Sequence, residues 1–129
     1  MARVQRLQHT SVPMPPGGAA HARWFYGTVL GMPEKQPPRS LGTLSLVWFR
    51  AGDDEVHLFE EESMGGASTN QHLALQVDSL DEYRARFAEH GVSVREDMPI
   101  VNRPRCFVRD PFGNLIEILE VSGPYDGEV

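Results

Sequence analysis

The chain has 129 residues, of which 40% are hydrophobic and 23% charged, and its formal net charge is −6. This length suits one domain with a real hydrophobic core, and the acidic balance without a basic stripe argues against a nucleic-acid partner. No apolar run is long enough to span a bilayer. The N-terminal MARVQRLQHT lacks the apolar core of a signal peptide. Because Cys106 is the single cysteine, an intrachain disulfide is excluded, and we expect a cytoplasmic protein.

Two elements are expected at the start of the chain. The segment 6–12, RLQHTSV, alternates as a strand does, which places His9 on the same face as Leu7. A helix is predicted within 17–32, GGAAHARWFYGTVLGM, because its aromatic and aliphatic residues supply an apolar surface. Gly31 suits the left-handed position that ends a helix.

Two more strands are expected before the middle of the chain. The first lies in 41–50, LGTLSLVWFR, and the second in 54–61, DEVHLFEE. In the second, His57 and Phe59 share the face opposite the aliphatic residues. The following segment, 61–70, reads EESMGGASTN, and its glycine and serine content predicts a flexible joint.

The second half begins in a similar way. The segment 70–77, NQHLALQV, alternates as a strand with His72 on the face opposite its leucines. A helix then starts at Ser79, which forms a capping box with Glu82, and ends at Gly91.

The last two strands carry the most specific signal. The segment 103–109, RPRCFVR, leads into DPFG at 110–113, which suits a type I turn. The next segment, 115–120, is LIEILE, a strand with Glu117 at its centre. An unpaired buried carboxylate would cost several kcal/mol. Glu117 therefore needs water, a cation or a hydrogen-bond donor.

The two halves form an internal repeat. When His9 is aligned with His72, His57 aligns with Glu117, each pair being separated by one predicted helix. The spacing from His9 to His57 is 48 residues, and that from His72 to Glu117 is 45. Each half then reads strand, helix and further strands, with a potential metal ligand on its first and last strand.

This arrangement resembles the vicinal oxygen chelate superfamily, which includes glyoxalase I, methylmalonyl-CoA epimerase, extradiol dioxygenases, fosfomycin-resistance enzymes and bleomycin-binding proteins. The resemblance covers about residues 5 to 120 and rests on LQHTSV, FYGTVLGM, QHLALQVDSLDE and DPFGNLIEILE. It implies an α+β fold in which two tandem βαβββ modules form curved mixed sheets around a cleft, with the helices outside. The expected single glyoxalase-like domain, 1–129, has module one at about 5–60, the joint at 61–70 and module two at about 71–121.

The resemblance also implies a metal site at His9, His57, His72 and Glu117. His57 departs from the pattern, because glyoxalase-like and epimerase-like members more often carry Glu or Gln there. Three imidazoles and one carboxylate suit a divalent Zn, Fe, Ni, Co or Mn ion. On an octahedral ion, four protein ligands leave two adjacent positions for a substrate with two neighbouring oxygens. A tetrahedral zinc site with all four ligands would instead be closed and structural.

A proton-transfer group is required as well. Carried over from glyoxalase-like members, this role falls to Glu117, which we expect to exchange between ligand and base. His57 is the competing candidate, because imidazole also moves a proton near neutral pH.

Three functions follow from these residues. The first is a metal-dependent lyase, isomerase or epimerase that acts on a small chelating substrate through an enolate-like intermediate. The second is a non-haem iron dioxygenase of the extradiol type, in which His9, His72 and Glu117 hold the iron and His57 is an acid–base group. The third is a non-catalytic protein that binds a drug or metabolite, as bleomycin-resistance proteins do.

Other residues carry weaker indications. Arg103 and Arg105 could bind an anionic substrate group, or could belong to a solvated loop. Phe49 and Phe59 could line a substrate cavity, with core packing as the alternative. Cys106 is expected to be a packed thiol. The charges expected to face solvent or to sit at strand ends are Glu60 and Glu120.

The expected partners are a small-molecule substrate and a second copy of the chain. Small two-module members of the superfamily commonly form homodimers, sometimes with metal ligands from both subunits. Neither a nucleic acid nor a membrane is expected as a partner.

Overall fold

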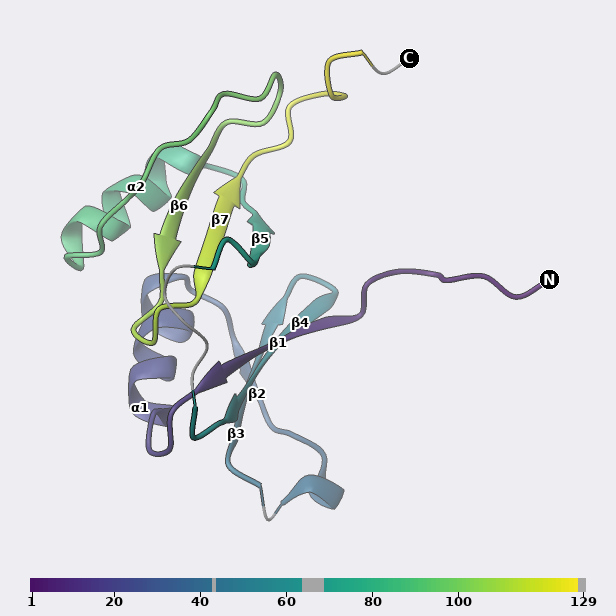
Figure 1. Cartoon of the computed structure of the whole chain (residues 1–129), viewed down its shortest axis with the longest axis vertical. Helices are drawn as coiled ribbons and strands as arrows, with labels where there is room; N and C mark the ends of the chain where they lie inside the picture. Colours follow the sequence, from purple (N-terminus) through teal and green to yellow (C-terminus); the bar gives the residue numbers. More distant parts are fainter. Residues whose placement is uncertain (43, 64–68, 128–129) are drawn as a thin grey trace. The chain divides into compact units, whose positions relative to one another are not determined.

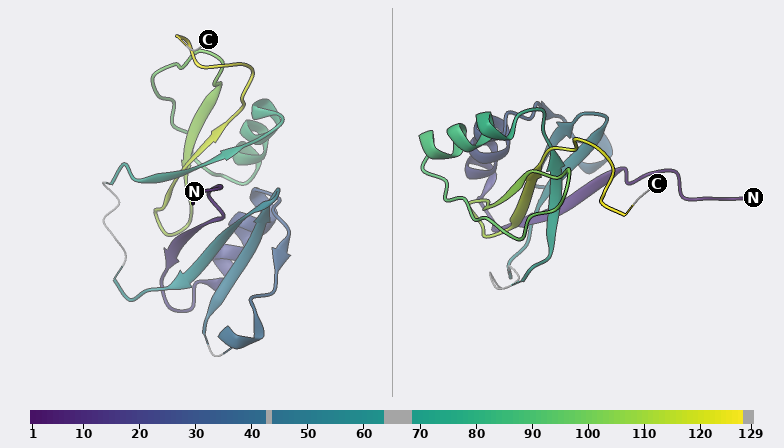
Figure 2. Two further views of the ribbon diagram at one scale, coloured as in Figure 1. Left: turned by 90° about the vertical axis from the view of Figure 1, so that its right-hand side faces the viewer. Right: turned by 90° about the horizontal axis from the view of Figure 1, so that it is seen from above.

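The chain forms two compact units, Met1–Met64 and Gly65–Val129, each of which we describe by itself (Figure 1). The computed structural model describes residues 1–42, 44–63 and 69–127. Each unit has a small mixed sheet with a helix against one face (Figures 1 and 2). This arrangement confirms the predicted α+β class. Part of the joint predicted at 61–70, namely 64–68, lies outside the described residues.

Unit one has the predicted βαβββ order. Its elements are β1 (His9–Met14), α1 (Ala19–Ala22), a π-helix (Arg23–Val29), β2 (Glu34–Lys35), a 3-10 helix (Arg39–Leu41), β3 (Leu46–Ala51) and β4 (Asp54–Glu60). The strand order in the sheet is β1-β4-β3-β2. β1 runs parallel to β4, and the other neighbours are antiparallel.

Strand alternation divides the sheet of unit one into an apolar and a polar face. On the apolar face Val47, Phe49 and Leu58 are almost fully buried. The helical region covers this face, and the ring of Tyr26 stacks on Phe49 with 5.7 Å between centroids. The opposite face carries the polar and aromatic residues of β1, β3 and β4, including His57.

Three predictions for unit one need correction. The first strand begins only at His9, so Leu7 precedes it and is 77% exposed. The strand predicted in 41–50 starts at Leu46. The predicted helix forms, but it widens into a π-helix in which the N–H of Leu30 donates to the carbonyl of Phe25.

Unit two repeats the plan with a shorter sheet. Its elements are β5 (His72–Gln76), α2 (Leu80–Glu89), β6 (Arg105–Arg109) and β7 (Leu115–Leu119). The strand order is β5-β7-β6, with β5 parallel to β7 and β6 antiparallel to it. An isolated bridge between Arg95 and Phe107 stands where β2 stands in unit one.

The predicted ends of α2 and the predicted turn are confirmed. The Ser79 hydroxyl accepts a hydrogen bond from the N–H of Glu82 at 3.2 Å, and Gly91 has a φ of 71°. The turn before β7 is closed by the N–H of Gly113, which donates to the carbonyl of Asp110 at 3.1 Å. The Asp110 carboxylate also accepts from the N–H of Asn114, which fixes the start of β7.

In both units, a glutamate at a strand end accepts a hydrogen bond from a backbone N–H at the start of the helix. In unit two, Glu120 follows β7 and accepts a hydrogen bond from the N–H of Leu80, the first residue of α2, at 2.6 Å. In unit one, Glu60 ends β4 and accepts from the N–H of Gly17, just before α1, at 3.0 Å. Both glutamates lie at strand ends, as predicted, and in addition they accept hydrogen bonds from backbone donors at the helix starts.

Candidate functional site

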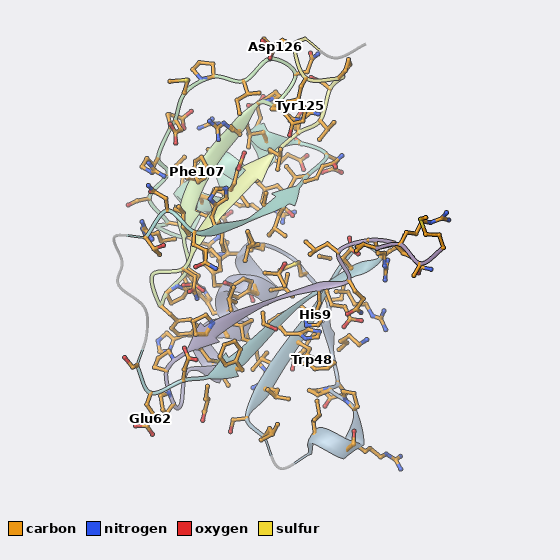
Figure 3. All side chains as sticks on the ribbon, turned by 45° about the vertical axis from the view of Figure 1, so that its right-hand side comes forward. His9, Trp48, Glu62, Phe107, Tyr125 and Asp126 are labelled. Carbon is orange, nitrogen blue, oxygen red and sulfur yellow. The ribbon has the colours of Figure 1, made fainter. Side chains whose placement is uncertain are left out.

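The polar face of unit one has His57 at its centre. Its ring lies between Trp48, at 3.6 Å and 2°, and His9, at 4.2 Å and 18°. The sheet register produces this stack, because Trp48 of β3 and Ser11 of β1 are the direct cross-strand partners of His57. Figure 3 labels His9 and Trp48 on this unit. Only 8% of His57 is exposed.

Glu55 determines which ring nitrogen of His57 carries the proton. One of its carboxylate oxygens lies 2.8 Å from Nε2 of His57, and the other accepts from Nζ of Lys35 at 2.6 Å. These hydrogen bonds, that of Lys35 foremost, lower the pKa of Glu55 to about 2. Burial lowers the pKa of His57 and outweighs the opposing effect of Glu55. At neutral pH a neutral His57 therefore donates from Nε2 to the ionised Glu55, which leaves the lone pair on Nδ1.

His9 has the opposite arrangement of its ring nitrogens. Its Nδ1 lies 2.6 Å from the side-chain oxygen of Gln8, which can only accept. Nε2 of His9 is then the nitrogen with a lone pair. Because a ring lone pair lies in the ring plane, two stacked imidazoles such as His9 and His57 do not direct their lone pairs to one point.

The polar face of unit two brings His72 and Glu117 together. They are diagonal neighbours on β5 and β7, and Nε2 of His72 lies 3.2 Å from Oε1 of Glu117. Nδ1 of His72 donates to the carbonyl of Asn70 at 2.8 Å. In a neutral His72, the lone pair of Nε2 would thus face a carboxylate oxygen. That contact is repulsive unless a cation, either a proton or a metal ion, lies between the two atoms.

Arg105 contacts the other oxygen of Glu117. Its NH1 lies 3.4 Å from Oε2 of Glu117, and its NH2 donates to the carbonyl of Met98 at 2.7 Å. The guanidinium also lies over the ring of Phe107, which Figure 3 labels, 5.2 Å from its centroid. Only 13% of the Arg105 side chain and 11% of the Glu117 side chain are exposed. Arg105 is therefore held inside the unit, beside the carboxylate.

Two residues predicted to touch a substrate make contacts within their own units. Arg103 donates from NH1 to the carbonyls of Asn102 and Gly123, and its guanidinium stacks on Tyr125 at 3.9 Å. It thus holds the segment after β7. Phe49 lies on the apolar face, so its alternative interpretation, core packing, is correct, because strand alternation turns it away from His57.

Phe59 is the remaining residue predicted to contact a substrate. Phe59 is half-buried and shares the face of His57 on β4. Two residues of this face were missed in the sequence. Glu55 had a signal, since it lies two positions before His57 on the same face. Lys35 had no signal in the sequence, because only the pairing of β2 with β3 brings it to the face of His57.

His9 and His57 lie together in unit one, and His72 and Glu117 lie together in unit two. Within either unit, the described residues include no group of three or more His, Cys, Asp or Glu side chains arranged to hold a metal ion.

Among the same residues, no helix is long and apolar enough to cross a membrane.

Comparisons with known proteins place these features in a family. The model of the Glyoxalase/Bleomycin resistance protein/Dioxygenase superfamily matches residues 6–118. No curated protein matches the sequence. Among solved structures, a putative glyoxalase family protein from Bacillus anthracis is 33% identical, with a TM-score of 0.87 over 94% of this chain and 98% of that one.

Two more distant structures share the fold. The fosfomycin resistance protein FosX from Listeria monocytogenes is 20% identical, with a TM-score of 0.75 over 91% of each chain. An antibiotic-binding protein from Streptomyces is 23% identical, with a TM-score of 0.73 over 95% of this chain and 100% of that one. The family match spans nearly all of both units, so the chain belongs to the glyoxalase/bleomycin resistance protein/dioxygenase superfamily, as its repeated strand–helix–strand pattern predicted.

Proposed function

We propose that the protein is a divalent-metal-dependent enzyme of the lyase, isomerase or epimerase type, acting on a small substrate with two neighbouring oxygens. The observation that carries this proposal is the contact between Nε2 of His72 and Oε1 of Glu117. The contacts of His72 support this proposal, since its Nδ1 is anchored on a carbonyl and its Nε2 is directed at the carboxylate.

The ligand set follows from which nitrogens carry lone pairs. His9 and His72 both have Nδ1 anchored on an oxygen, and Nε2 of His72 faces the carboxylate of Glu117. Together with Glu117 they supply the residue types of a two-histidine, one-carboxylate set, which would suit a divalent ion such as Zn, Fe, Ni, Co or Mn. A bound ion of this kind would act as a Lewis acid toward the substrate oxygens.

We assign His57 to proton transfer rather than to metal binding. Its Nε2 is occupied by Glu55, and its ring is stacked on both sides, so Nδ1 is the atom that can accept a proton. Glu55 holds the ring in this tautomer, and Lys35 keeps Glu55 ionised. Glu117 remains the competing base that the sequence suggested, although Arg105 already holds one of its oxygens.

Elemental analysis of protein purified without an affinity tag tests the metal. We expect roughly one divalent ion per chain, and loss of most of it in His72→Ala and Glu117→Ala. His21→Ala is the matched control, because His21 is exposed on α1 and should leave the metal content unchanged. If the wild-type protein binds no divalent ion even when one is supplied, the contact is only a hydrogen bond between His72 and Glu117, and the metal proposal fails.

A dioxygenase is the second candidate. It is favoured by the same hydrogen bond of His57 to Glu55, because this bond leaves His9, His72 and Glu117 as the iron-binding set of non-haem oxygenases. Oxygen uptake by the Fe(II)-loaded protein with catechols separates the two candidates, since the first requires no oxygen. A protein without metal would instead fit the third class, a drug- or metabolite-binding protein.

We further propose that the protein works in the cytoplasm as a homodimer, as the family resemblance and the single cysteine suggest. Light scattering at micromolar concentration tests the dimer, and a monomer under these conditions would contradict it. Fractionation of cells that express the native gene tests the compartment.

A further inference from the structure

The two oxygens of Glu117 have different partners. Oε1 faces Nε2 of His72 at 3.2 Å, and Oε2 faces NH1 of Arg105 at 3.4 Å. The carboxylate is almost buried, with 11% of the side chain exposed. It therefore cannot turn freely to present both oxygens on the same side.

Arg105 is itself fixed at several points. Its NH2 donates to the carbonyl of Met98, and its guanidinium lies over Phe107. Phe107 is the direct cross-strand partner of Glu117 on β6 and β7, so this aromatic ring supports the arginine beside the carboxylate. Among the described residues, the buried Nε of Arg105 has no hydrogen-bond partner. A buried guanidinium with an unsatisfied N–H is a costly arrangement, and the neighbouring carboxylate provides the compensating charge.

We propose that Arg105 is a positioning residue that keeps Glu117 a ligand through one oxygen only. A carboxylate can bind a cation through one oxygen or through both. Because Oε2 is held by Arg105, only Oε1 is offered beside His72. The coordination position that a second carboxylate oxygen would fill then stays open for water or substrate. This inference rests on the proposed metal-dependent function and replaces substrate binding as the role of Arg105.

Mn²⁺ bound to the full-length protein tests the inference without a known substrate. Relaxation of water protons measures how many waters remain on each bound Mn²⁺. A set of two histidines and one carboxylate oxygen would leave about three of the roughly six positions of the ion to water. In Arg105→Met, Oε2 is released and displaces one water, so we expect relaxivity per bound Mn²⁺ to fall by about one third.

Arg109→Met is the matched control. Arg109 lies on the same strand and the same face as Arg105, but its NH1 donates to the carbonyl of Gly113 and not to Glu117. The same substitution there should leave the relaxivity per bound ion unchanged. If Arg105→Met does not fold, Arg105→Gln keeps a polar group at the buried position and should show the same decrease.

The outcomes separate this inference from the proposed function. If wild-type protein binds no Mn²⁺ or other divalent ion, both are overturned. Suppose that the wild-type protein binds Mn²⁺ and that the Arg105 variants have the same relaxivity per bound ion as the wild type. Only the inference is then overturned. Variants that lose binding altogether also overturn it, because Arg105 would then control affinity and not the mode of binding. A decrease confined to the Arg105 variants supports it.

Discussion

The carboxylate of Glu120 accepts a hydrogen bond from the N–H of Leu80 at 2.6 Å, which ties the residue after β7 to the first residue of α2. Removing it leaves a backbone donor unsatisfied at the positive end of the helix. We expect Glu120→Ala to reduce the free energy of unfolding by about 1 kcal/mol. Urea unfolding followed by circular dichroism measures this loss.

Glu89→Ala is the control for Glu120, because Glu89 ends α2, where a negative charge is unfavourable. This control should be neutral or slightly stabilising. An equal loss in both variants would show that the effect does not come from the helix start.

The two faces of the first sheet predict different costs for two phenylalanines. Phe49 is fully buried against Tyr26, so Phe49→Ala should cost about 3–5 kcal/mol of unfolding free energy. Phe59 lies on the polar face and is half-buried, so Phe59→Ala should cost roughly 1 kcal/mol or less. Chemical denaturation of both variants makes the comparison. Equal costs would contradict the assignment of faces.

The ion pair of Arg84 and Glu96 predicts a weak pH dependence. Two guanidinium nitrogens donate to the carboxylate at 2.6 and 2.8 Å and lower the pKa of Glu96 below its ordinary 4.5. Because the folded-state pKa is the lower one, the stabilisation is complete above pH 4.5 and disappears as the pH falls through the folded-state value. Since the pair is largely exposed, Glu96→Gln should cost at most about 1 kcal/mol at pH 7.

The check for Glu96 is denaturant unfolding of the wild type and of Glu96→Gln over a range of pH. The difference between them should vanish at low pH, where the carboxylate is protonated in both states. A difference that persists there would point to a cause other than charge.

The buried thiol of Cys106 should be unreactive in the folded protein. Cys106 is fully buried, and this burial raises the pKa of its thiol. A disulfide reagent should therefore react slowly with native protein at pH 8 and rapidly after unfolding, because the thiolate is the nucleophile. Absorbance of the released thiol measures both rates.

The same shift predicts behaviour at high pH. An unfolded thiol ionises near pH 8.5, whereas the folded one stays neutral to higher pH, so the wild type should lose stability as the pH rises above about 8.5. Cys106→Ala should lack this part of the dependence. Rapid labelling of the native protein would contradict the burial.

The sequence by itself determined the α+β class, the repeated strand–helix–strand order and the faces of β5 and β7. A strand places alternate residues on opposite faces whatever surrounds it. The alternation alone therefore places His72 on the face opposite Leu73, and Glu117 on the face opposite Ile116 and Ile118. The ends of α2 were equally local, because Ser79 and Gly91 act on their own backbone.

Only the tertiary structure decided which partners those side chains meet. Glu55 and Lys35 determine which ring nitrogen of His57 carries the proton. Lys35 reaches the face of His57 only through the pairing of β2 with β3. The contact between Arg105 and Glu117 likewise forms only because β6 pairs with β7. The physical reason is that alternation along a strand fixes a face, whereas the register between strands fixes a neighbour. That register depends on contacts between residues far apart in the sequence.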